Sequence, residues 1–254
     1  MGSQKFIHLC NHTTFSLCKG AIHINDLVKR TASEEMPAVA ITDICNLFGA
    51  LEFSIACKKN NIQPIIACDL LIDTEDSDRS NISDLELEET FKRIILIAKN
   101  DIGYLHLLDL ASEIHLSRIR NLAPHIKLSE LKEKSEGLIV ICGGEKGILG
   151  KNILRNNLSQ AEKLAEKFKE MFVDNFYIQI SRHGIGAERK IEQNLIDIAY
   201  KTQIPLVAIN DNYFLDRSMY EAQDILSCIG QKRYLIEEDR EKLTKDHHFK
   251  SSSE

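Results

Sequence analysis

"AVAITD" at residues 38–43 and the "LFGALEFSIACKKN" that follows at residues 47–60 decide the fold class. The first stretch is an apolar run that ends in Thr42 and Asp43, which is typical of a strand buried on both faces. The second carries apolar residues at three- and four-residue spacing, which predicts an amphipathic helix. A strand followed by a helix, repeated along a chain, predicts parallel strands joined by right-handed crossovers.

The same alternation recurs along the whole chain. The strands are predicted at Lys5–Cys10, Ala38–Asp43, Pro64–Ile72, Arg93–Ala98, Gly137–Cys142, Phe176–Ile180 and Pro205–Asn210. The helices are predicted at 24–36, 47–60, 102–116, 159–172 and 188–203. Seven such strands indicate the α/β class and favour a closed or nearly closed βα barrel over an open sheet.

Polar residues at the strand ends favour the barrel. They are His12, Thr42 with Asp43, Asp69, Gln179 with the following Arg182 and His183, and Asn210 with Asp211. In a βα barrel the carboxyl ends of all strands meet on one face, and that face holds the active site. We therefore expect these side chains to converge.

The overall composition excludes some classes of protein. The 254 residues are 43% hydrophobic and carry a net charge of −6, which supports a core but disfavours non-specific DNA binding by this chain alone. Seven cysteines without a CxxC pair indicate reduced thiols and a cytoplasmic location. No signal peptide is visible and the apolar runs are too short to span a bilayer, so no membrane partner is expected.

The domain organisation is predicted from changes in charge. Residues 1–230 form the predicted barrel domain, and residues 231–254 form a charged segment that would lead into an absent core. Within the barrel, residues 73–90 hold eight acidic residues and one basic residue, with no Pro or Gly. Such a run of like charges predicts an exposed, mobile insertion.

Six ordered stretches carry a family resemblance. They are "FIHLCNHTTFSLCKGA", "MPAVAITDICNLFGALEF", "IQPIIACDL", "LIAKNDIGYLHL", "NFYIQISRHG" and "LVAINDNYF". Together they resemble the PHP (polymerase and histidinol phosphatase) domain at the N-terminus of bacterial DNA polymerase III alpha subunits. The resemblance runs from about residue 6 to the end of the chain and implies a distorted seven-stranded βα barrel.

The resemblance also implies where a metal site would lie. Complete members resemble phosphoesterases with two or three metal ions, which lower the pKa of a bound water. The matching positions in this chain are Cys10, His12, Lys19, Ile44, Asp69, Arg93, Gly144, Asp211 and Tyr213. Five of these depart from ligand types: Lys19, Ile44, Arg93, Gly144 and Tyr213. We therefore expect a vestigial pocket with no catalytic residue, no cofactor and at most one weakly bound divalent metal ion.

The two cations suggest how such a pocket could survive without metal. Asp43, Asp69 and Asp211 would repel one another if buried together. We hypothesise that Lys19 and Arg93 take roughly the place of the ions, with Arg93 making a bidentate pair to a carboxylate where the geometry allows. Lys19 Nζ or a guanidinium nitrogen of Arg93 should then lie within about 4 Å of one of these carboxylates.

Other polar residues of the sequence are compatible with either a functional or a structural role. Five could surround the pocket or simply pack: His8, Asp43, Gln179, Arg182 and His183. "GGEKG" at residues 143–147 lacks the full P-loop spacing, so it favours a tight turn over a phosphate loop. His247 and His248 are interpreted as part of a solvated tail.

Three functions follow from the resemblance. The first is a structural module of a DNA polymerase III alpha subunit in DNA replication. Its partners would be the remainder of that subunit, the proofreading exonuclease subunit and, through the full-length protein, DNA. The chain alone should not polymerise, since it holds no palm carboxylate cluster. The alternatives are a metal-dependent phosphoesterase or 3′–5′ exonuclease at the remnant pocket, and a free-standing enzyme similar to histidinol phosphatase.

Overall fold

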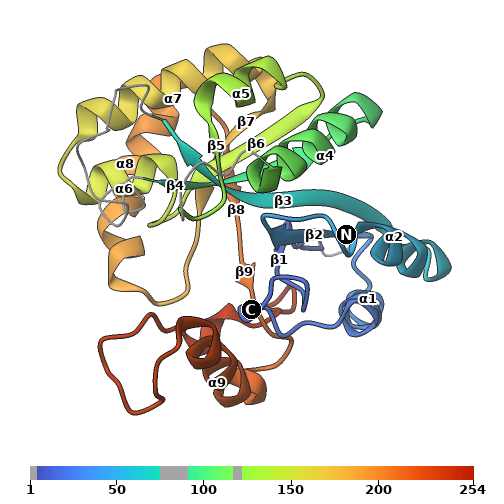
Figure 1. The fold of residues 1–254 in the computed structure, drawn as a ribbon. Helices are drawn as coiled ribbons and strands as arrows, with labels where there is room; N and C mark the ends of the chain where they lie inside the picture. Colours follow the sequence, from blue (N-terminus) through green and yellow to red (C-terminus); the bar gives the residue numbers. More distant parts are fainter. Residues whose placement is uncertain (1–4, 75–90, 117–121) are drawn as a thin grey trace. The chain divides into compact units, whose positions relative to one another are not determined.

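The structure is a computed structural model that describes residues 5–74, 91–116 and 122–254 (Figure 1). Apart from its first two residues, the acidic insertion predicted at 73–90 lies outside the described residues. In the part of the chain that is described, no helix is both long enough and apolar enough to cross a membrane.

The strands follow the predicted pattern closely. They are β1 Cys10–Asn11, β2 Ala38–Ile44, β3 Gln63–Asp73, β4 Lys92–Ala98, β5 His125–Lys127, β6 Leu138–Gly143, β7 Phe176–Ile180, β8 Leu206–Ala208 and β9 Asp211–Asn212. The short strands β5 and β9 were not predicted, and only the last predicted residue of the first strand, Cys10, is in β1. Strands of two or three residues give too short an alternation for sequence patterns to detect.

Two sheets contain these strands. The larger has the order β2-β3-β4-β6-β7-β8 with β5 paired to β3, and the smaller pairs β1 with β9. The unpredicted β5 pairs parallel with β3, and the predicted parallel pairing is confirmed for β6 with β7 and for β7 with β8. It is wrong for β4 and β6, which pair antiparallel from Ile95↔Ile141 to Ala98↔Leu138. The chain between them forms β5, which pairs with β3, so it is not a simple crossover.

The helices carry the predicted amphipathic patterns. They are α1 Ile24–Ser33, α2 Ala50–Lys59, α4 Asp101–Leu116, α5 Leu128–Glu133, α6 Ile148–Leu154, α7 Leu158–Phe172, α8 Gly186–Thr202 and α9 Tyr220–Gln231. Among the described residues, 3-10 turns lie at Val173–Asn175, Arg217–Met219 and Lys245–His247. The short helices α5 and α6, and also α9, were not predicted.

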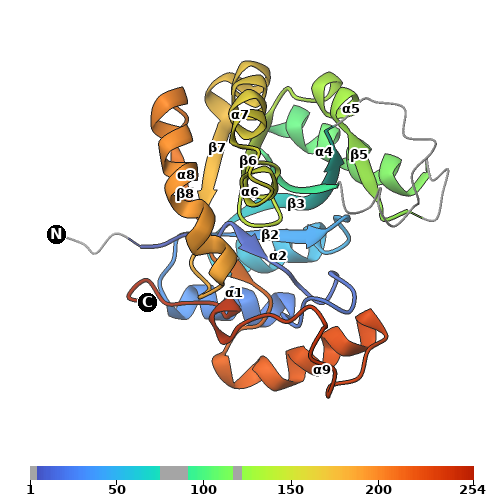
Figure 2. The ribbon, with the colours of Figure 1, turned by 90° about the vertical axis from the view of Figure 1, so that its left-hand side faces the viewer.

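The chain divides into two compact units. The first contains Met1–Ala67, Ser181–Ile185 and Ile209–Glu254, and the second contains Cys68–Ile180 and Gly186–Ala208. In the second unit, α6, α7 and α8 pack against one another, while α4 packs against β4 (Figures 1 and 2). Residues 231–254 belong to the first unit, and the boundary predicted at residue 230 stays a prediction.

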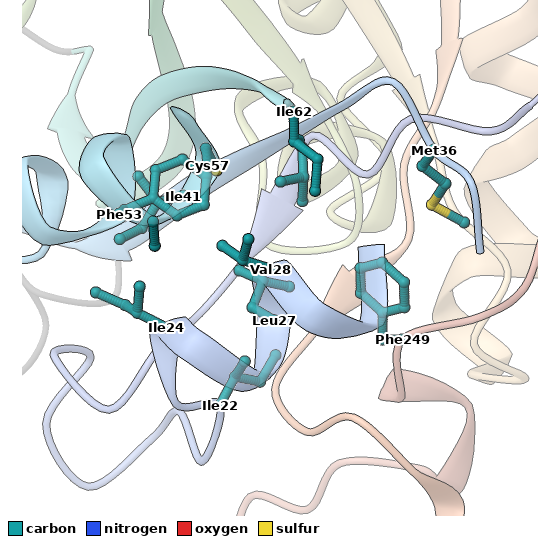
Figure 3. Close-up of a cluster of buried hydrophobic side chains, with 12 residues drawn as sticks. Ile22, Ile24, Leu27, Val28, Met36, Ile41, Phe53, Cys57, Ile62 and Phe249 are labelled. Carbon is teal, nitrogen blue, oxygen red and sulfur yellow. The ribbon is translucent and has the colours of Figure 1, made fainter. Parts of the chain in front are cut away.

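A hydrophobic cluster lies in the core of the first unit (Figure 3). Its buried members are Ile22, Ile24, Leu27, Val28, Met36, Val39, Ile41, Phe53, Ala56, Cys57, Ile62 and Phe249. Helices α1 and α2 supply half of them, since both turn one apolar stripe inward. Phe249 comes from the C-terminal segment, so that segment is part of this core.

Candidate metal centre

Two side chains of the first unit converge on one carboxylate oxygen of a third. Cys10 and Asp211 are paired neighbours on β1 and β9, and His12 follows β1. His12 Nε2 lies 2.7 Å from Oδ1 of Asp211, and the Cys10 thiol donates to the same oxygen at 3.0 Å. The sulfur of Cys10 lies 3.5 Å from His12 Nε2. All three residues are buried. The parallel pairing of β1 with β9 therefore builds the group.

The donor set fits one divalent ion. The ligand atoms of Cys10, His12 and Asp211 all lie within 4.8 Å of one another. A thiolate, an imidazole nitrogen and a carboxylate are the ligand types of zinc sites, and catalytic zinc sites use three protein ligands. Within the described residues this is the one group of three or more His, Cys, Asp or Glu with that spacing.

The same geometry disfavours a cysteine nucleophile. A Cys–His–Asp relay needs the two ring nitrogens of histidine to face different partners, the thiol and the carboxylate. Here a single nitrogen, His12 Nε2, lies near both Cys10 and Asp211. The thiol of Cys10 is also fully buried.

Asp43 anchors the loop that carries His12. Its carboxylate accepts hydrogen bonds from the Thr13 amide at 2.7 Å, the Thr13 hydroxyl at 2.7 Å and the Ser16 hydroxyl at 2.6 Å. Ser16 Oγ in turn accepts from the Ile44 amide at 3.1 Å. Hydrogen bonds to a buried carboxylate are the stronger kind, so Asp43 fixes the loop after β1.

Histidine and tyrosine rings line the region beside Asp211. Tyr213 stacks on His12 at 4.3 Å between ring centroids, and His247 stacks on His183 at 4.1 Å. His183 Nε2 accepts the backbone N–H of Asp211 at 3.0 Å, so His183 positions the third candidate ligand. The interpretation of His247 and His248 as solvated is wrong, because both are 4% exposed. The aromatic Phe249, which follows them in the sequence, was the signal that this segment packs against a core.

Of the other predicted residues, Lys19 and Arg182 are exposed and His8 is buried. Lys19 is exposed, and Gln223 donates to its backbone oxygen. Its predicted place among the carboxylates is therefore wrong, because the loop turns its side chain into solvent. Arg182 is also exposed. His8 contacts Asn212 Nδ2 at 2.9 Å and the carbonyl oxygen of Lys250 at 2.8 Å, through its two ring nitrogens.

Asp69, Arg93 and Gly144 lie in the second unit. Arg93 Nε lies 2.6 Å from Oδ2 of Asp69, with side chains 15% and 6% exposed, so the predicted ion pair of Arg93 is confirmed. Gly144 begins the turn after β6, where the Gly147 amide donates to its carbonyl at 3.1 Å. The tight turn predicted for residues 143–147 is thereby confirmed. A Cβ atom at position 144, in place of Gly144, would lie 3.4 Å from the side-chain nitrogen Nε2 of Gln179.

Comparison with known proteins identifies the family of the chain. The model of the PHP domain matches residues 8–183, which is most of the chain. The chain belongs to the PHP domain family. Its fold is therefore the distorted βα barrel that the sequence predicts.

Curated proteins that match nearly the whole chain in sequence include DNA polymerase III alpha subunits. Those of Rickettsia bellii, Caulobacter vibrioides and Treponema pallidum are 38%, 33% and 34% identical over 98%, 99% and 100% of this chain. The chain covers only 20%, 22% and 22% of their lengths. It therefore spans about a fifth of the curated relatives that it matches.

A solved structure supports the PHP fold independently. A protein of Bifidobacterium adolescentis assigned as a metal-dependent phosphoesterase matches with a TM-score of 0.53. The match covers 81% of this chain and 86% of that chain at 13% identity. At this identity the likeness shows the fold alone.

A pH dependence is expected from His8 of this PHP domain. Burial is the main reason that the pKa of His8 falls from 6.5 to about 4; the hydrogen bond to the Lys250 carbonyl opposes this shift, and the charges of Lys250 and His248 add to it. The unfolded chain binds a proton below pH 6.5, and the folded chain does so only near pH 4. Stability should therefore fall by about 1.4 kcal/mol for each pH unit as the pH is lowered from 6.5 towards 4.

Urea unfolding at a series of pH values measures this slope. His8→Gln, which removes the titrating ring, should flatten the profile between pH 6.5 and 4. His23→Gln is the matched control, because His23 is exposed and makes no capping hydrogen bond at α1. An unchanged profile in His8→Gln would assign the acid sensitivity to other groups.

Proposed function

We propose that this chain is the PHP module of a bacterial replicative DNA polymerase III alpha subunit, retained for structure and docking rather than for hydrolysis. The observation that carries the proposal is the alignment of 98–100% of the chain with alpha subunits at 33–38% identity. In this role the module stabilises the remainder of the subunit and docks the proofreading exonuclease subunit. It works in the bacterial cytoplasm, and its access to DNA comes through the full-length protein.

The side chains at the matching positions support a degenerate site. Asp69, which stands where the family has a glutamate ligand, is occupied by Arg93 through a buried ion pair. Tyr213 stands where a histidine ligand would be and stacks on His12 instead. A cation repels a metal ion, and a phenol is a poor replacement for a neutral imidazole. These substitutions lower the number of ligands below that of a multi-metal phosphoesterase.

The second candidate function is metal-dependent hydrolysis of a phosphodiester, as in a phosphoesterase or a 3′–5′ exonuclease. The convergence of Cys10, His12 and Asp211 favours it. These residues would hold one ion, which when bound would activate a water near neutral pH. The Asp43 hydrogen bonds and the His183 contact would keep His12 and Asp211 in place. A free-standing phosphatase is favoured by no observation beyond the fold.

We expect no metal-stimulated hydrolysis of a generic phosphodiester or of a DNA 3′ end, and at most one equivalent of weakly bound Zn²⁺ or Mn²⁺. The reason is that one thiol, one imidazole and one carboxylate converge, whereas the chemistry of the family uses several ions. Elemental analysis and a nuclease assay measure the two quantities. Turnover that is lost in both His12→Ala and Asp211→Ala would establish the second candidate instead.

The polymerase reading has its own test. The reading frame should continue for hundreds of codons beyond Glu254, since the relatives are about five times as long as this chain. A stop codon soon after Glu254 would refute that reading, whatever the metal content of the chain.

A further inference from the structure

An exposed apolar tip follows helix α9. Tyr234, Leu235 and Ile236 are consecutive and are 76%, 52% and 90% exposed. On α9, Ile225 and Ile229 are four residues apart and are 49% and 65% exposed, so they share one face of the helix. Contiguous exposed apolar side chains mark interaction surfaces. We name these five residues the α9 patch.

The loop that presents the tip is anchored at its base. Arg240 makes a two-point pair with Asp224 of α9, with Nη2 2.6 Å from Oδ2, and its side chain is 2% exposed. Gln231 and Glu241 exchange two hydrogen bonds, from Gln231 Nε2 to the Glu241 carbonyl at 2.9 Å and from the Glu241 amide to Gln231 Oε1 at 3.1 Å. The loop therefore leaves and returns at the same end of α9 (Figure 1).

A second set of bonds holds the tip itself. Arg233 reaches Asp239 at 2.8 Å and Glu237 at 2.9 Å. The Tyr234 amide donates to Glu237 Oε1 at 2.7 Å, and the Glu237 amide donates to the Tyr234 carbonyl at 3.1 Å. The side chains of Arg233, Glu237 and Asp239 thus bond within the loop. The apolar side chains of residues 234–236 are exposed. A loop ordered before binding loses less entropy on docking, which favours a binding role.

The size of the α9 patch indicates the kind of occupant. A stable interface between separate proteins uses about 20–30 residues on each side, far more than five apolar side chains. A covalently linked partner needs less contact, because a short linker gives an effective concentration in the millimolar range. In the alpha subunits that match this chain, about four-fifths of the polypeptide lies outside the aligned part.

We propose that the α9 patch docks onto an apolar surface of the polymerase polypeptide that continues beyond residue 254. The proposal rests on the proposed function, since it needs that continuation to exist. Docking would fix the orientation of the PHP module relative to the rest of the subunit. Because the contact is intramolecular, it would persist at any protein concentration.

Thiol labelling tests the docking directly. Ile236→Cys places a reactive group at the tip, and Lys59→Cys on the exposed end of α2 is the control in the same unit. Labelling is read for each peptide by mass spectrometry, since Cys18 is also exposed. In the 254-residue chain the two positions should react at similar rates. In the full-length subunit Ile236→Cys should react about tenfold more slowly, as expected for a docked form that is about 90% populated.

The other outcomes overturn the proposal. Equal rates in the full-length subunit would show that the tip stays exposed. Protection in the short chain that disappears on dilution would assign the patch to a second copy, and protection only after addition of the exonuclease subunit would assign it to that subunit. Equal protection of Lys59→Cys would show general burial. Where the reading frame continues and the tip stays reactive, the docking fails while the proposed function stands.

Discussion

Arg93→Ala is expected to lower the free energy of unfolding by about 3–5 kcal/mol. Arg93 Nε lies 2.6 Å from Oδ2 of Asp69, and the two side chains are 15% and 6% exposed. Removal of the guanidinium leaves the Asp69 carboxylate buried beside a cavity. The loss of a buried charge partner is the reason for the large effect. Urea unfolding of the wild-type and variant chains measures it.

A double variant separates the charge effect from packing. Asp69→Asn with Arg93→Leu removes both charges and fills most of the volume, so it should destabilise less than Arg93→Ala alone. Lys201→Ala is the control for an exposed pair in the same unit, since Lys201 pairs with Glu162 at 2.7 Å while 61% exposed. It should leave the unfolding midpoint unchanged. An Arg93→Ala chain as stable as the Lys201→Ala chain would show that the Arg93 pair is solvated.

Most of the larger strands and helices could be predicted from the sequence. β2, β4, β6 and β7 lie within one residue of their predicted starts. The reason is that strands buried on both faces read as uninterrupted apolar runs, and their local signal is strong. The antiparallel pairing of β4 with β6 depends on where β5, which lies between them in the sequence, is paired. β5 pairs with β3, and no local sequence pattern predicts such a long-range contact.

The residues of the candidate site, too, could be predicted from the sequence only in part. The sequence identified Cys10, His12 and Asp211 through the family resemblance, and the structure brings them together. It could not tell that Lys19 faces solvent, because a one-residue change in a loop reverses the direction of a side chain. It also missed His247, whose burial depends on the return of the C-terminal segment to the first unit. Charged composition alone indicated a solvated tail.

Phe249→Ala is expected to lower the free energy of unfolding of the first unit by about 3–5 kcal/mol. Phe249 is fully buried in the cluster that α1 and α2 build (Figure 3). Its ring also lies 4.0 Å from that of His8, centroid to centroid. Truncation removes the aromatic ring and leaves a cavity that the surrounding helices can fill only in part, so both terms destabilise.

The position of Phe249 links this core to the candidate metal centre. Its amide donates to the Phe214 carbonyl at 2.9 Å, and the Tyr213 amide donates to the His247 carbonyl at 3.0 Å. Tyr213 follows β9, the strand that carries Asp211. A loosened C-terminal segment should therefore increase amide exchange at Tyr213 as well as at Phe249. Hydrogen exchange followed by mass spectrometry measures this local effect beside the global unfolding curve.

Phe48→Ala is the matched control for this prediction. Phe48 is the same residue type in the same unit, but it is 68% exposed, so its truncation should change stability by no more than about 0.5 kcal/mol. If the two alanine variants unfold together, Phe249 does not belong to the core. The C-terminal segment would then be a detachable tail, as its charge suggests. If only Phe249→Ala unfolds early and Tyr213 exchanges faster, residues of the C-terminal segment hold β9, and thereby Asp211, in place.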